Sequence, residues 1–191
     1  MKPPDNSLTA SVVSLMQTEP VTRSASQEKA SVRNLLVLGP IVLLQLSLAF
    51  YRIDHQSFWT DEVASLLAAA PRESLFSSKI WLNGQGPLYF ALLHIWMMIG
   101  DSQFVVRSLA AILGAAAVCL TYALGLRLAN RKFAAISAVL MATSPFLIWY
   151  SQETRYITLA IATSLLSMYS FSRALVRSSF RACGFYAISS T

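Results

Sequence analysis

Four stretches without a single charged residue set the main constraint on how this chain folds. They cover residues 35–51, 108–126, 133–150 and 156–172, and each is rich in large apolar side chains. A membrane-spanning helix needs about 20 predominantly apolar residues, within a range of about 17–25. We therefore expect an all-α, multi-pass transmembrane protein with spans at about 35–53, 104–127, 133–150 and 156–174.

The composition agrees with a membrane protein and excludes two other classes. Hydrophobic residues make up 55% of the 191 residues and charged residues only 13%, with a mean hydropathy of +0.53. Average soluble domains have about 45–50% apolar and about 25% charged residues. An ordinary soluble domain and a wholly disordered chain are therefore both excluded.

The two ends of the chain differ from the region of the spans. Residues 1–33 are rich in Ser, Thr, Pro and Gln, which predicts a disordered tail. Residues 182–191 are uncharged but stop after ten residues, so they predict an incomplete span. The two cysteines, Cys119 and Cys183, form no CxxC pattern and indicate neither a disulfide framework nor a metal site.

The distribution of basic residues predicts the orientation. Residues 87–100 form an apolar run that is too short to span and suits a surface helix. If this run does not cross, ten of the fifteen Lys and Arg residues share one side: Lys2, Arg23, Lys29, Arg33, Arg127, Arg131, Lys132, Arg173, Arg177 and Arg181. Basic loops favour the cytoplasm, so we expect a cytoplasmic N-terminal tail in a plasma or inner membrane.

The net charge of +6 has a second conceivable cause, a nucleic-acid partner. The basic residues are dispersed over separate short loops and do not gather on one face, which argues against such a partner. No phosphate-binding GxxxxGK[ST] or GxGxxG pattern is present either. We therefore attribute the basic balance to membrane topology, and the bilayer is the expected partner.

The long outer segment, at about 54–103, contains an acidic pair, Asp61 and Glu62. Thr60 is a suitable N-cap for a short surface helix that ends near Pro71. Two interpretations of the pair remain open. Carboxylates in a first helical turn interact favourably with the helix dipole. Alternatively, one carboxylate acts as a general base at the membrane surface or binds a metal.

The next outer turn carries Gln152, Glu153 and Arg155 between aromatic residues. One interpretation is an interfacial anchor with a local Glu–Arg pair, which contributes little if solvated. The other is recognition of an anion, since a guanidinium binds phosphate with two parallel hydrogen bonds. His94 and Trp96 lie in the short apolar run, where we expect them to serve packing.

An ordered set of short motifs resembles a known enzyme family. The motifs are residues 56–62 (QSFWTDE), 86–94 (GPLYFALLH), 100–108 (GDSQFVVRS), 144–153 (SPFLIWYSQE) and Arg155. Together they resemble the N-terminal part of the dolichyl-phosphate-mannose–protein mannosyltransferase-like glycosyltransferases of the GT-C superfamily. The resemblance covers about residues 34–180.

The resemblance implies a membrane enzyme that moves a sugar from a polyprenyl-phosphate donor to a lipid, glycan or protein acceptor on the outer face. It implies that Asp61 is the catalytic carboxylate, that Glu62 supports it, and that transfer inverts the sugar. Glu153 and Arg155, with the neighbouring Gln152, match positions near the donor phosphate or a metal. The resemblance leaves the metal open: a divalent ion is one possibility.

The chain departs from the family at two places. Gln85 and Gly86 replace part of a His-Pro-Pro motif, and Tyr156 and Ile157 replace a Met-Tyr pair. These replacements put in doubt a histidine contact at the first place and a tyrosine role at the second.

The resemblance also implies a truncated form, because related enzymes are considerably longer. Residues 34–191 then correspond to the N-terminal part of the transmembrane domain, with little activity in isolation. Two alternatives are a small multi-pass transporter or permease subunit, and an inactive membrane fragment. Transporters usually place ionisable groups at mid-membrane, whereas the four apolar stretches hold no Asp, Glu, Lys or Arg.

Overall fold

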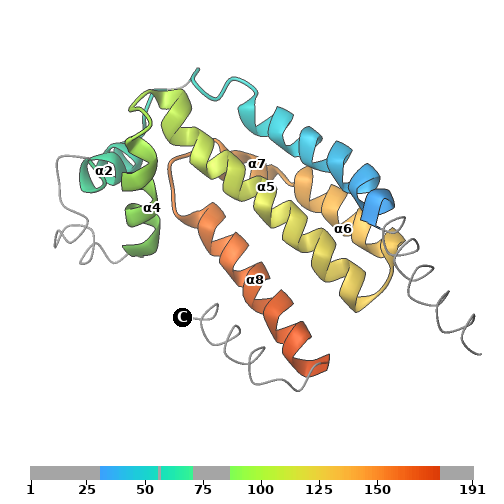
Figure 1. The fold of residues 1–191 in the computed structure, drawn as a ribbon. Helices are drawn as coiled ribbons and strands as arrows, with labels where there is room; N and C mark the ends of the chain where they lie inside the picture. Colours follow the sequence, from blue (N-terminus) through green and yellow to red (C-terminus); the bar gives the residue numbers. More distant parts are fainter. Residues whose placement is uncertain (1–30, 56, 71–86, 177–191) are drawn as a thin grey trace, which may run out of the picture. The chain divides into compact units, whose positions relative to one another are not determined.

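The computed structural model describes residues 31–55, 57–70 and 87–176, and these contain helices and no strands. The first helix is Ser31–Phe50. It is followed by α2 (Thr60–Ala68), α4 (Pro87–Met97), α5 (Gln103–Leu128), α6 (Arg131–Ala142), α7 (Pro145–Ser151) and α8 (Ile157–Val176) (Figure 1). The all-α class is confirmed for the described residues.

The chain divides into two compact units, residues 1–39 and 40–191. Only residues 31–39 of the first unit are described, and they form the opening turns of the first helix. Helix therefore begins before residue 34, where the tail was expected to end. The rest of the expected tail and the expected incomplete span at 182–191 lie outside the described residues.

Two described helices are long and apolar enough to cross a membrane. These are Ser31–Phe50, with a mean hydropathy of 1.7, and α5, with 2.1. The 26 residues of α5 give it a length of about 39 Å, which exceeds the hydrocarbon thickness of about 30 Å. The expected spans at 35–53 and 104–127 correspond to these two helices.

The expected span at 133–150 is not one straight helix. It is divided into α6 and α7, whose axes differ by 56°. The break lies at Thr143 and Ser144, directly before Pro145. Proline lacks a backbone N–H and disfavours helical geometry in the residue before it. The pair can still form a third, bent span.

The fourth expected span, at 156–174, corresponds to α8. Its 20 residues make it about 30 Å long. Its many Ser and Thr residues, together with Arg173, lower its mean hydropathy. Helix α8 is therefore not among the described helices that are long and apolar enough to cross a membrane. A span at α8 therefore remains a prediction.

Helix α5 packs against α4, α6, α7 and α8, and small residues let it approach α6, α7 and the first helix closely. A Cβ atom on Gly125 would lie 2.7 Å from the Cα atom of Ala134 in α6. A Cβ atom on Gly114 would lie 2.8 Å from Gln45 Nε2 and closer still to Ser151 Oγ. Ala110 and Gly114, one helical turn apart on α5, are both buried.

We call residues 51–102 the first connecting segment and residues 152–156 the second connecting segment. In the first, α4 has only 11 residues, about 16 Å, so it is too short to span. Its Tyr89, Phe90 and Leu93 form a buried cluster with Ala68 and Ala69 at the end of α2 and with Val106 and Leu109 of α5. This cluster fixes both short helices against the start of α5.

His94 and Trp96 both contribute to this packing, as expected. A ring nitrogen of His94, Nδ1, lies 3.2 Å from the carbonyl oxygen of Ala69. Trp96 donates from Nε1 to the carbonyl oxygen of Val105 at 2.8 Å. Neither side chain lines the pocket described below.

Replacing Gly125 with alanine tests the close contact between α5 and α6. Gly125→Ala should lower the free energy of unfolding by about 1–3 kcal/mol, although alanine is the better helix former. The matched control is Gly39→Ala, because a Cβ atom there meets nothing within 4 Å. Loss of helical circular dichroism in detergent on heating measures both, and equal melting temperatures would refute the contact.

Candidate functional site

Glu62 is the buried centre of the polar network in the first connecting segment. It occupies the third position of α2, and its side chain is only 1% exposed. Its Oε2 accepts a hydrogen bond from the backbone N–H of Trp59 at 3.1 Å. Trp59, with φ −73° and ψ 157°, is therefore the N-cap of α2, and the expected N-cap at Thr60 was wrong by one residue. Glu62 sets this register because its side chain satisfies the N-cap N–H.

Arg107, in the second turn of α5, binds Glu62 with two hydrogen bonds. The Nε atom donates to Oε1 at 3.1 Å and Nη2 donates to Oε2 at 2.8 Å. The Arg107 side chain is 3% exposed. A buried, bidentate pair has favourable hydrogen-bond geometry. Removing only one of its two partners is costly, because the other charge stays buried.

The Arg107 guanidinium also binds the start of the first connecting segment. Nη1 of Arg107 donates to the carbonyl oxygen of Ile53 at 2.7 Å, and Nη2 lies 3.5 Å from that of Ser57. Its Cζ lies 5.1 Å from the centroid of the Phe58 ring. Arg107 thus holds the segment that leads into α2.

Glu62 also binds the second connecting segment. Its Oε1 accepts a hydrogen bond from the backbone N–H of Thr154 at 2.8 Å. Burial by itself raises the pKa of Glu62, but the hydrogen bonds from Arg107, Thr154 and Trp59 outweigh burial and hold the pKa below its ordinary value. Glu62 is therefore an ionised acceptor whose two oxygens are both engaged.

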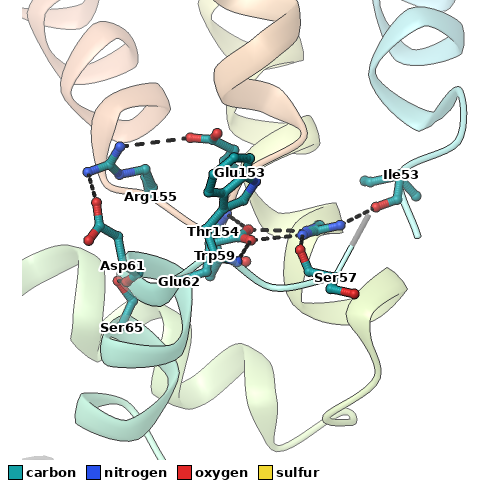
Figure 2. Close-up of polar contacts among 10 residues, drawn as sticks. Ile53, Ser57, Trp59, Asp61, Glu62, Ser65, Glu153, Thr154 and Arg155 are labelled. Carbon is teal, nitrogen blue, oxygen red and sulfur yellow. Dashed lines mark hydrogen bonds and ion pairs between the residues drawn. The ribbon is translucent and has the colours of Figure 1, made fainter. Parts of the chain in front are cut away.

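Asp61 lies beside Glu62 in sequence but faces solvent, with 67% of its side chain exposed. Its Oδ2 pairs with Nη2 of Arg155 at 2.8 Å, and Arg155 is itself 32% exposed. On its other side, Nη1 of Arg155 lies 4.0 Å from Oε2 of Glu153. Arg155 thus stands between two carboxylates (Figure 2).

Glu153 is more enclosed than Asp61, with 14% of its side chain exposed. Burial raises the pKa of Glu153, and the nearby Arg155 guanidinium opposes this shift without cancelling it. Among the described residues, none gives its Oε2 a hydrogen bond. Glu153 therefore differs from Glu62, whose carboxylate is fully satisfied.

These groups line an open pocket of about 380 Å³, which we call the Asp61 pocket. Its lining residues are Trp59, Thr60, Asp61, Glu62, Trp149, Glu153 and Arg155. Four of the five site residues proposed from the sequence meet here, from segments about 90 positions apart. The arrangement offers an exposed carboxylate and a guanidinium on one wall.

Gln152 is the site residue that the structure does not bring to the pocket. Its Nε2 donates to the carbonyl oxygens of Leu48 at 2.9 Å and Tyr51 at 3.2 Å. These carbonyls lie at the end of the first helix, where the last turn leaves acceptors unsatisfied. Gln152 therefore ties the second connecting segment to that helix.

Arg107 and Thr154 are the important residues that the site prediction missed. Thr154 acts through its backbone, which sequence reasoning cannot anticipate. Arg107 did leave a signal, because it directly precedes the charge-free run 108–126. A charged side chain at that place needs a partner, but several carboxylates of the outer segments were candidates, and only the structure identifies Glu62.

A metal site is not evident in the part of the chain that the structure describes. No group of three His, Cys, Asp or Glu side chains there has suitable positions for one ion. The oxygens of Glu62 are engaged by nitrogen donors, and Asp61 is paired with Arg155. The donor set of the Asp61 pocket therefore does not fit a metal, and we derive no step through one.

Comparison with known proteins gave one match. A family model described as dolichyl-phosphate-mannose-protein mannosyltransferase matches residues 84–190, more than half of the chain. The matched region includes α4 to α8 with Arg107, Glu153 and Arg155, whereas Asp61 and Glu62 precede it. No curated protein and no solved structure matched.

The two arginines should differ sharply in their effect on stability. Arg107→Met leaves Glu62 buried without its cation, so the free energy of unfolding should fall by about 3–5 kcal/mol. Arg155→Met removes an exposed pair and should cost at most about 1 kcal/mol. Chemical unfolding in detergent measures both values. Similar losses for the two variants would contradict the assignment of Glu62–Arg107 as the main structural pair.

The depressed pKa of Glu62 predicts a stability change in acid. Because the folded state holds Glu62 ionised, its contribution is complete above the ordinary pKa of 4.5 and is lost as the pH falls through the lower folded value. The unfolding free energy should therefore decrease below about pH 4.5. In Glu62→Gln this part of the slope should disappear; an unchanged slope would rule out Glu62 as its source.

Proposed function

Because the chain belongs to the dolichyl-phosphate-mannose-protein mannosyltransferase family, we propose that the Asp61 pocket is a site of sugar transfer. In this proposal the donor is a polyprenyl-phosphate sugar and the acceptor carries a free hydroxyl group. The observation that carries the proposal is the meeting of an exposed carboxylate, Asp61, with a partly exposed guanidinium, Arg155, in one open pocket.

Asp61 is the general base of the proposed reaction. A general base must reach the proton that it removes, and Asp61 is the more accessible carboxylate of the acidic pair. It would take the proton of the acceptor hydroxyl as the oxygen attacks the anomeric carbon of the sugar. The attack from the face opposite the phosphate inverts that carbon.

Glu62 is a positioning residue in this proposal. Its oxygens bind Arg107, Trp59 and Thr154, so they are engaged and shielded from an acceptor. By tying α2 to α5 and to the second connecting segment, Glu62 fixes the backbone from which Asp61 projects. Rigid supporting contacts of this kind keep a reactive group in its productive geometry.

Arg155 binds the phosphate of the donor in this proposal. As the new carbon–oxygen bond forms, the bond between the anomeric carbon and the phosphate oxygen breaks, and that oxygen keeps the electron pair. The developing charge on the polyprenyl phosphate needs a cation beside it, and a guanidinium matches phosphate oxygens in a bidentate manner. Glu153, with its raised pKa, lines the same wall.

We further propose that the pocket lies at the outer surface of a plasma or inner membrane, with the N-terminus in the cytoplasm. The basic residues Arg127, Arg131 and Lys132 lie between α5 and α6 or at their adjoining ends, remote in sequence from the pocket, and basic loops favour the cytoplasm. A polyprenyl phosphate places its headgroup at the membrane surface, where short helices such as α2 and α4 suit the depth.

Transfer of a labelled sugar tests the proposal. Membranes that contain the chain, or a longer protein that includes it, are supplied with a labelled polyprenyl-phosphate sugar, and incorporation into acceptors is measured. Asp61→Asn should reduce the rate by about 10²–10⁴-fold, the usual contribution of a general base. Asp101→Asn, at an exposed carboxylate away from the pocket, is the control. Undiminished transfer in Asp61→Asn would remove Asp61 from the mechanism.

A further inference from the structure

Two ion pairs formed by adjacent residues differ in how easily each exchanges its partner. The Glu62–Arg107 pair is almost fully buried, and it is held by two hydrogen bonds, at 3.1 and 2.8 Å. The Asp61–Arg155 pair has one hydrogen bond, at 2.8 Å, and two partly exposed side chains. Solvent-exposed pairs of this kind contribute little to stability. The first pair is therefore fixed, and the second can be replaced by a competing ion.

The exposed pair also engages both groups that the proposed reaction needs. While Oδ2 of Asp61 accepts from Arg155, the carboxylate is a weaker base and the guanidinium is a less available phosphate ligand. A neutral acceptor has no charge with which to compete for Arg155. A phosphate group does have one, and it offers oxygens in the geometry that a guanidinium binds.

We propose that the Asp61–Arg155 ion pair is an exchangeable latch, which a phosphate ligand opens by taking Arg155 and so frees Asp61 to act as a base. The proposal rests on the proposed function, and it adds an order of events: the phosphate-bearing donor binds before the acceptor is deprotonated. The fixed Glu62–Arg107 pair keeps α2 in place while Arg155 changes partner.

In this proposal, Glu153 keeps Arg155 in the pocket after the ion pair with Asp61 has opened. Arg155 Nη1 lies 4.0 Å from its Oε2, which lacks a hydrogen-bond donor among the described residues. When Arg155 leaves Asp61, it remains beside Glu153 on the same wall of the pocket. The guanidinium thus needs only a side-chain movement, because Glu153 and Arg155 belong to the same connecting segment.

A double-mutant cycle on phosphate binding tests the latch. The full chain is placed in phosphatidylcholine nanodiscs, and its affinity is measured for a polyprenyl monophosphate, for inorganic phosphate and, as a control, for the uncharged polyprenol. If Asp61 competes for Arg155, then Asp61→Asn should tighten phosphate binding by about two- to fivefold, the range expected for an exposed pair. The gain should vanish in an Arg155→Gln background.

The cycle separates exchange from simple charge repulsion. Removing Asp61 also removes a negative charge near the phosphate, but that effect should persist without Arg155. An equal gain in both backgrounds would therefore overturn the latch while leaving polyprenyl phosphate as a ligand. Asp101→Asn should leave the affinity unchanged, and circular dichroism of each variant checks that its helices are intact.

Comparing inorganic phosphate with the polyprenyl phosphate distinguishes a failure of the latch from a failure of the proposed function. Coupling with inorganic phosphate, together with no binding of the polyprenyl phosphate, would support the latch and reject the lipid-linked donor. Coupling with the polyprenyl phosphate supports both. Binding of neither phosphate to any variant would overturn the latch.

Discussion

The buried pair between Glu62 and Arg107 is the interaction on which the described site depends. Through its two carboxylate oxygens, Glu62 reaches α5, the N-cap of α2 and the backbone of the second connecting segment. Arg107 adds the carbonyl oxygens of Ile53 and Ser57. One ion pair therefore joins three regions of the chain that are far apart in sequence, and its burial explains why Glu62 is a structural residue here.

The acidic pair illustrates how adjacent residues in a helix take opposite roles. Successive helical residues point about 100° apart, so Asp61 cannot share the environment of Glu62. Hydrogen-bond donors surround the Glu62 carboxylate, whereas the Asp61 carboxylate faces a pocket that also contains the Arg155 guanidinium. Of the two interpretations left open by the sequence, the favourable interaction with the start of the helix holds for Glu62, which binds the Trp59 N–H. General-base chemistry stays a proposal, and it concerns Asp61.

Much of the fold was predictable because hydropathy alone specifies apolar helices. The first helix, α5 and the short α4 follow from their uncharged lengths, and the bend before Pro145 follows from proline chemistry. Local rules failed where contacts between distant segments decide the outcome. The N-cap at Trp59, the capping role of Gln152 on the first helix, and the partner of Arg107 all depend on such contacts. The roles of Asp61, Glu153 and Arg155 stay predictions.

The second connecting segment alternates between two kinds of contact, and this alternation limits how its length can vary. Gln152 and Thr154 bind the first helix and Glu62, whereas Glu153 and Arg155 line the pocket. Inserting or deleting one residue would exchange the two sets, so that anchoring groups met solvent and pocket groups met the protein. Related chains should therefore tolerate substitutions in this segment more readily than any change in its residue count.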